Sequence, residues 1–154
     1  MEAQVDISAI KALAAEFGQI AGEAVDSGVK ASSIVLQKQM KEVFGTEGGG
    51  VIGQTETGRN IYLGAPAGSV PSVRTGTLRR SIQRSNIEDH SIRVGTNKKY
   101  GYWLEYGTEH MAARPWLYKS LSMAQAAMER ATLTAIETTI NKRIAALTGK
   151  AGGV

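Results

Sequence analysis

The feature that most constrains this fold is a proline-free stretch, residues 6–44, whose apolar side chains recur every three or four positions. That spacing predicts one amphipathic helix, with Asp6 as its N-cap and Gly45 at its end. Unbroken, residues 7–44 would reach about 57 Å, whereas a domain of this chain length has a radius of gyration of about 15 Å. The helix must therefore either break near Gly28 or project beyond its own domain. A projecting amphipathic helix needs another chain to cover its apolar stripe.

A second helical pattern covers residues 114–148, near the other end of the chain. Pro115 suits the first turn of this helix, where a missing N–H group costs nothing. The apolar positions that repeat with helical spacing are Leu117, Leu121, Ala124, Met128, Ala131, Ala135, Ile140, Ile144 and Leu147.

A glycine-rich segment, residues 45–76, separates the two helical patterns. It holds nine of the eighteen glycines and two of the three prolines, which predicts a long flexible loop with at most a short strand at 60–63. Loops of this length in small domains are usually either functional or disordered until bound, and the two cases look the same in sequence.

Residues 77–110 predict a small sheet followed by an aromatic motif. Two antiparallel strands are expected around 81–87 and 91–95, with a turn at Glu88 to His90 and with Ile82, Ile92 and Val94 pointing inward. The aromatic residues from Tyr100 onward alternate like a strand but also lie one helical turn apart, and we favour a short helix that ends at Gly107. The sequence as a whole predicts one α+β domain over 1–154, with two long helices packed on a small antiparallel sheet.

Charge is unevenly distributed along the chain, although its net value is only +4. Residues 1–58 carry four lysines against eight acidic residues, and residues 59–99 carry eight basic residues against two acidic ones. Such polarity suits head-to-tail contacts between copies, or a ring with one basic surface. A solvated surface with chance clustering is the alternative.

Several classes of chemistry find no support in the sequence. The absence of cysteine excludes disulfides, thiolate zinc sites and cysteine nucleophiles, and the two histidines, His90 and His110, are poor material for a metal site. The glycine spacing at 48–55 resembles a phosphate-binding loop but has Gln54 in place of the lysine and follows a helix. Asp89 beside His90 indicates a polar hairpin turn, and there is no Gly-x-Ser-x-Gly elbow. We therefore predict no catalytic, cofactor or metal site.

The sequence also lacks membrane and export signals. No apolar run approaches the roughly 20 residues that span a bilayer, and the N-terminus has no basic region leading into an apolar one. We expect a soluble protein that is not exported.

Glu105, surrounded in sequence by Tyr102, Trp103 and Tyr106, is the one candidate for a tuned acid, because burial among aromatic side chains would raise its pKa. General acid–base catalysis needs a second group, and the neighbouring Glu109 falls in an expected loop. The interpretation that we favour is structural: Glu105 forms a buried pair with an arginine such as Arg114 or Arg79. The aromatic residues are then core or interface anchors.

The basic segment at 73–84 offers Arg74, Arg79, Arg80 and Arg84 to phosphate groups or to an acidic protein surface. No helix-turn-helix, zinc-finger or RNA-binding signature accompanies these arginines. A small basic nucleic-acid-binding regulatory protein is therefore the alternative function, and an enzyme centred on Glu105 ranks third.

Three motifs in order resemble the head-tail joining or tail-completion (neck) proteins of tailed bacteriophages. They are VRTGTLRRSI at 73–82, VGTNKKYGYWLEYGT at 94–108 and ARPWLYKSL at 113–121. The resemblance spans about residues 70–122. The chain departs from the family pattern in its glycine-rich insert and at Gly101, where such proteins often carry alanine.

The resemblance implies a structural virion protein without enzymatic activity, located in the neck and assembled in the host cytoplasm. It implies a homo-oligomeric ring, with six-fold symmetry favoured over twelve-fold, between the head connector or portal-side proteins and the tail tube or tail terminator. The genome would pass through the ring, with non-specific DNA contact and no membrane. The residues that the motifs assign to interface or structural roles are Arg74, Thr75, Gly76, Leu78, Arg79, Arg80, Tyr102, Trp103, Glu105, Tyr106, Gly107, Thr108, Arg114, Pro115 and Trp116.

Overall fold

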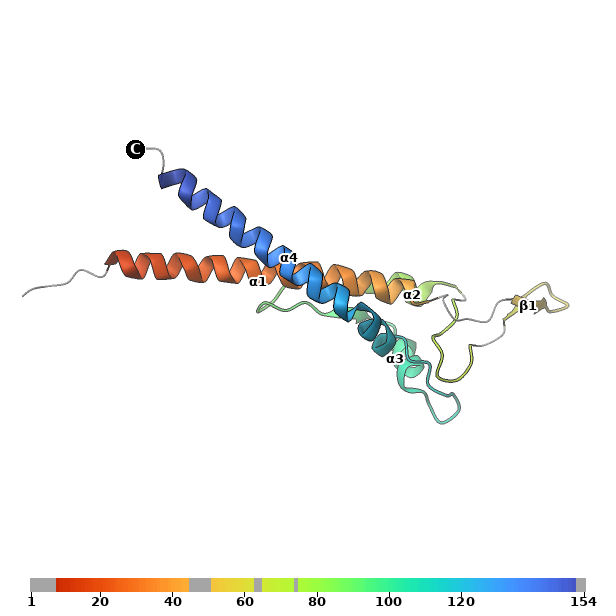
Figure 1. Ribbon diagram of the computed structural model, residues 1–154. Helices are drawn as coiled ribbons and strands as arrows, with labels where there is room; N and C mark the ends of the chain where they lie inside the picture. The colour runs from red at the N-terminus through yellow and green to blue at the C-terminus, as the bar shows by residue number, and fades with distance from the viewer. Residues whose placement is uncertain (1–7, 45–50, 63–64, 74, 152–154) are drawn as a thin grey trace, which may run out of the picture.

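A computed structural model of the protein describes residues 8–44, 51–62, 65–73 and 75–151 (Figure 1). Its longest elements are two helices of 35 residues each, α1 from Ser8 to Glu42 and α4 from Leu117 to Ala151. The α+β class is confirmed, as is the helix expected near each end of the chain. The predicted caps of the first helix, Asp6 and Gly45, lie outside the described residues.

The first helix, α1, continues through Gly28 without a break, so it projects rather than folding back. Its 35 residues correspond to a length of about 52 Å. Gly28 is the point at which α4 crosses α1 (Figure 1). A Cβ atom on Gly28 would lie 3.0 Å from a methyl group of Thr132 and 3.1 Å from Ile136. The glycine therefore serves close helix packing and not a kink.

Polar side chains also hold the helices together at this crossing. The Ser27 hydroxyl group lies 3.1 Å from the carbonyl oxygen of Ala135, and Thr139 Oγ1 donates a hydrogen bond of 2.8 Å to Ser27 Oγ. One turn further, the Arg143 guanidinium donates two hydrogen bonds to the Glu23 carboxylate. These hydrogen bonds raise the pKa of Arg143 above its usual value, although the pair is exposed.

We expect Gly28→Leu to separate the helices and to lower the thermal unfolding midpoint by several degrees, because the Leu side chain must displace Thr132 and Ile136. The matched control is Gly18→Leu on the same helix, where a new Cβ would meet no heavy atom within 4 Å. That control should raise the midpoint, since glycine costs a helix up to about 1 kcal/mol. Circular dichroism melts of both variants test the crossing, and equal shifts in the same direction would contradict it.

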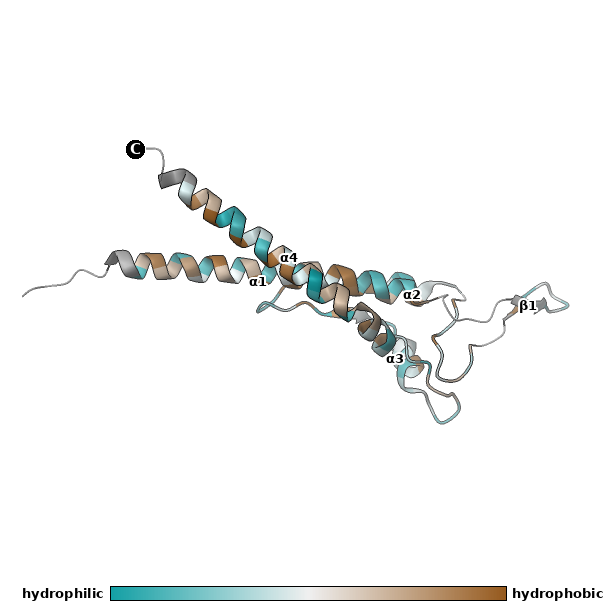
Figure 2. Cartoon of the chain, in the orientation of Figure 1, coloured by the Kyte–Doolittle hydropathy of each residue, from teal (hydrophilic) through white to brown (hydrophobic). Residues whose placement is uncertain are grey.

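Beyond the crossing the helices diverge, and the N-terminal part of α1 extends away from the rest of the molecule (Figure 1). Ile20 and Ala24 are buried, but every residue from 11 to 19 is exposed. Leu13 and Phe17 continue the same helical stripe and remain 53% and 57% exposed. Figure 2 shows hydrophobic positions, coloured brown, along this part of the α1 ribbon. Here the chain leaves an apolar stripe that none of its described elements covers.

In the described residues the strands form two separate two-stranded sheets, and one of them is the small antiparallel sheet that the sequence predicted. The pair β3 (Ile82–Arg84) and β4 (Val94–Thr96) is antiparallel, with Ile82 opposite Thr96. Both strands are shorter than expected, although the turn at 88–90 is confirmed. The pair β1 (Val51–Gln54) and β2 (Asn60–Tyr62) forms a second antiparallel hairpin within the glycine-rich segment. The strand expected at 60–63 is therefore present, while its partner β1 was not predicted.

The hydrophobic core lies where the C-terminal end of α1 meets the short helices. These are α2 (Thr77–Ser81) and α3 (Lys99–Tyr106). The buried core residues are Met40, Val43, Phe44, Val70, Leu78, Ile82 and Trp116, with Leu36, Val94 and Leu104 packed against them. Of the three inward positions predicted on the strands, Ile82 is fully buried, and Ile92 and Val94 are half-buried. The core therefore occupies one end of the molecule, opposite the free end of α1.

Candidate functional site

The residues of the aromatic motif meet at the junction of α3 and α4. The helix expected at 100–107 is confirmed as α3, and Gly107 ends it, donating its N–H to Trp103 O at 2.8 Å. A tight turn closed by Thr108 and Met111 follows, with Thr108 N–H donating to Met111 O at 2.8 Å. The chain then returns beside α3, where Arg114 N–H donates to Leu104 O at 2.7 Å. This return places the start of α4 next to the side chain of Glu105.

Glu105 caps the N-terminus of α4. Its Oε2 atom accepts hydrogen bonds from the backbone N–H groups of Trp116 at 2.8 Å and Leu117 at 2.7 Å, and Oε1 accepts one from Tyr118 at 3.0 Å. These N–H groups have no partner within a helix, and α4 has no acidic residue in its own first turn. A carboxylate at this position also interacts favourably with the positive end of the helix dipole. Glu105 thus supplies from α3 the cap that α4 lacks locally.

The expected pairing of Glu105 with an arginine is wrong. Arg114 Nε instead donates to Ala65 O at 2.8 Å, and its Nη1 atom donates to Ala112 O at 3.4 Å. Glu105 is half-buried and not enclosed by the aromatic side chains. The expected position of Pro115 is wrong as well: it precedes α4, which begins at Leu117, because the cap fixes the helix start at the N–H groups of residues 116–118.

Trp116 is the one aromatic residue of this region that is fully part of the core. Its indole Nε1–H donates to Gly101 O at 3.0 Å, and its ring centroid lies 5.3 Å from that of Phe44. Gly101 is buried, and a Cβ atom there would lie 2.9 Å from a methyl carbon of Thr96 and 3.1 Å from Leu78. The glycine that departs from the resembled pattern is therefore explained by this tight packing.

Four other aromatic side chains, on α3 and at the start of α4, are exposed to solvent. Tyr106 and Tyr118 are 68% and 72% exposed, and Tyr102 and Trp103 are also at least half exposed. The rings of Tyr102 and Tyr106 pack against each other in a tilted arrangement, with centroids 4.7 Å apart. We call these four residues the aromatic surface. Exposed aromatic side chains of this density are typical of protein–protein interfaces.

Within the motif at 73–82, residues 77–81 form α2, and Ile82 begins β3. Gly76 has a left-handed φ of 70° at the N-cap of α2, and the Thr75 and Thr77 hydroxyl groups lie 2.9 Å apart. Leu78 is buried, whereas Arg79 and Arg80 are exposed.

The described arginines of the basic segment lie on two adjoining elements, α2 and β3. Arg84 lies on β3, where its Nη1 atom donates to Ser33 Oγ of α1 at 3.3 Å, and Arg79 and Arg80 lie on α2. Arg74 falls outside the described residues.

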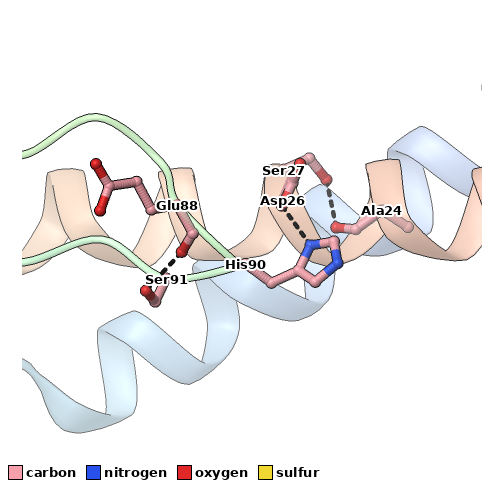
Figure 3. A network of polar contacts seen from close by, with 6 residues as sticks. All are labelled: Ala24, Asp26, Ser27, Glu88, His90 and Ser91. Atoms are coloured by element: carbon pink, nitrogen blue, oxygen red, sulfur yellow. Dashed lines mark hydrogen bonds and ion pairs between the residues drawn. The ribbon is translucent and has the colours of Figure 1, made fainter.

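The turn between β3 and β4 reaches α1 at its tip (Figure 3). Asp89 and His90 adopt left-handed φ values of 45° and 55°, which turns the chain between Glu88 and Ser91. His90 Nδ1 then lies 2.7 Å from Asp26 Oδ1 on α1. The sequence predicted the polar turn, but the Asp26 contact was missed because the partners lie 64 residues apart.

No group of three or more histidine, aspartate or glutamate side chains in the described part of the chain is arranged to hold a metal ion. None of the helices described is long and apolar enough to cross a membrane.

Comparison with known families places the chain among structural components of bacteriophage tails. It belongs to the HK97-gp10-like family, whose description reads "Bacteriophage HK97-gp10, putative tail-component", and the match covers residues 7–107. The comparisons with curated proteins and with solved structures gave no match. A tail component is part of the virion and contacts other structural proteins of the phage, so the phage assignment made from the motifs is confirmed.

The match runs from the start of α1 through α3 and ends at Gly107. It therefore includes Glu105 and the α2 motif, while the segment with Arg114, Pro115 and Trp116 lies beyond it.

Proposed function

We propose that this tail component forms a ring at the head–tail interface, joining the connector to the tail around the DNA channel. The observation that carries the proposal is the uncovered apolar stripe of α1, in which Leu13 and Phe17 are exposed beyond the helix crossing. A stripe of this kind is stable in water only when another chain covers it. The role is structural rather than enzymatic.

The aromatic surface supports a second contact, with a neighbouring ring of the neck or tail. The residues of this surface belong to α3 and to the start of α4, and α3 lies at the end of the molecule opposite the free end of α1 (Figure 1). In this proposal one surface joins copies within the ring, and the other meets the connector or the tail. Arg79, Arg80 and Arg84 supply positive charge for the channel or for an acidic neighbour.

The test is complementation of a phage that lacks this protein. We expect such a phage to accumulate DNA-filled heads and complete tails that do not join, as seen by electron microscopy, and we expect the chain supplied in trans to restore joined particles. A mutant that makes joined particles, or that makes no tails at all, would contradict a role at the interface.

A further inference from the structure

An apolar groove lies beside the core, at the end of the molecule opposite the uncovered stripe. It has a volume of about 600 Å³, and Phe44, Val73, Leu78, Leu104 and Met111 are among the residues that line it. Arg79 adds a positive charge to this lining. The molecule thus carries an apolar helical stripe at one end and an apolar concave surface at the other.

The stripe of one copy cannot reach its own groove. Phe17 lies on α1, and Phe44, which lines the groove, lies two residues after the end of the same continuous helix. Twenty-seven residues of helix hold them about 40 Å apart. A groove filled by this stripe must therefore belong to another copy.

We propose that the N-terminal part of α1 of one copy docks in the groove of the next. Leu13 and Phe17 are one helical turn apart, which is the spacing of anchors in helix-in-groove recognition. The charges are complementary as well, because Glu16 lies between these anchors in sequence and Arg79 lines the groove. Residues 1–26 carry five acidic residues and one lysine.

This contact is head-to-tail, because it joins two different surfaces of the same protein. When two copies join in this way, one stripe and one groove of the pair remain unoccupied, so further copies can bind by the same contact. The row of copies closes into a ring where the rotation between neighbours allows it. The inference rests on the proposed ring and specifies how its subunits join.

Chemical cross-linking tests the contact directly, since the chain has no cysteine of its own. Ala14→Cys lies beside Phe17 on α1, and Thr75→Cys lies in the groove lining. With a short bis-maleimide, the double variant should give a ladder of covalent dimers, trimers and larger species on a denaturing gel. The matched control pairs Thr75→Cys with Ala15→Cys, on the opposite face of α1, and should remain largely monomeric. Dimers alone, or equal ladders from both pairs, would overturn the proposed contact.

Charge reversal gives an independent test. We expect Glu16→Arg and Arg79→Glu each to weaken self-association of the full chain by about tenfold, because each places like charges together. The double variant should restore association, measured by sedimentation velocity. If both single variants lose self-association and the double variant does not regain it, the proposed contact is overturned.

The outcomes for the contact and for the function are separable. If the chain forms oligomers but the Ala14→Cys/Thr75→Cys variant gives no cross-linked ladder, the proposed contact is overturned and the proposed ring still stands. A chain that remains monomeric at every concentration, both alone and with tail tubes, yet restores joined phage particles overturns the contact and leaves the head–tail role.

Discussion

Gly107→Ala is expected to destabilise the domain by about 3 kcal/mol or more, a large share of the 5–15 kcal/mol that stabilises a typical domain. Gly107 has φ 80° and ψ −177°, a conformation that costs other residues about 1–3 kcal/mol. A Cβ atom would also lie 2.8 Å from Met111 O and 2.9 Å from Ala113 N. Both are backbone atoms, so relief requires movement of the turn that leads to α4.

The matched control is Gly68→Ala. Gly68 has a similar φ of 75°, but a Cβ atom there would meet no heavy atom within 4 Å. It should therefore show only the conformational cost, about 1 kcal/mol. Urea denaturation followed by circular dichroism measures both free energies of unfolding, and equal losses would show that the overlap at Gly107 is not a constraint.

Glu105→Ala is expected to lower the free energy of unfolding by about 2–4 kcal/mol. The substitution removes one carboxylate that accepts three backbone hydrogen bonds at the start of α4. A hydrogen bond to a charged group contributes about 1.5–3 kcal/mol net, and the bonds from Leu117 and Tyr118 are exposed, so water can replace part of what is lost. Glu105→Gln retains one oxygen acceptor and should lose about half as much. Because the partners are N–H groups and not a buried arginine, the effect belongs to helix capping and not to a broken ion pair.

Glu109→Ala is the control for Glu105, since this exposed acidic residue lies in the turn that follows α3. It should change stability by no more than about 0.5 kcal/mol. Unfolding followed by tryptophan fluorescence is well placed for the comparison, because buried Trp116 donates one of the three hydrogen bonds. If Glu105→Ala were as stable as Glu109→Ala, the Glu105 cap would not contribute to the free energy of unfolding.

Periodic apolar residues predicted both long helices, since α1 and α4 depend on patterns that recur locally. The same reasoning stated that an unbroken first helix must project, and Leu13 and Phe17 are indeed uncovered. Gly28 was ambiguous because a glycine for kinking and a glycine for close packing have the same sequence signature. Only the position of Thr132 and Ile136 on α4 separates the two.

The partners of side chains could not be predicted, because they depend on how distant segments pack. Glu105 was expected to pair with an arginine, but its partners are backbone N–H groups, which carry no residue-specific signal. Arg114 was assigned to Glu105 by charge alone and instead binds carbonyl oxygens, including that of Ala65. The contact between His90 and Asp26 was missed for the same reason.

We propose that copies of this chain assemble as a ring in the neck of the virion. The most direct test is the mass of the purified full chain by light scattering over a range of concentrations, alone and with tail tubes. We expect a discrete mass that is a fixed multiple of the 16.4 kDa chain, either in solution or on the tubes. A monomer that ignores the tubes and instead binds duplex DNA with strong salt dependence would contradict the claim and favour a nucleic-acid-binding regulator.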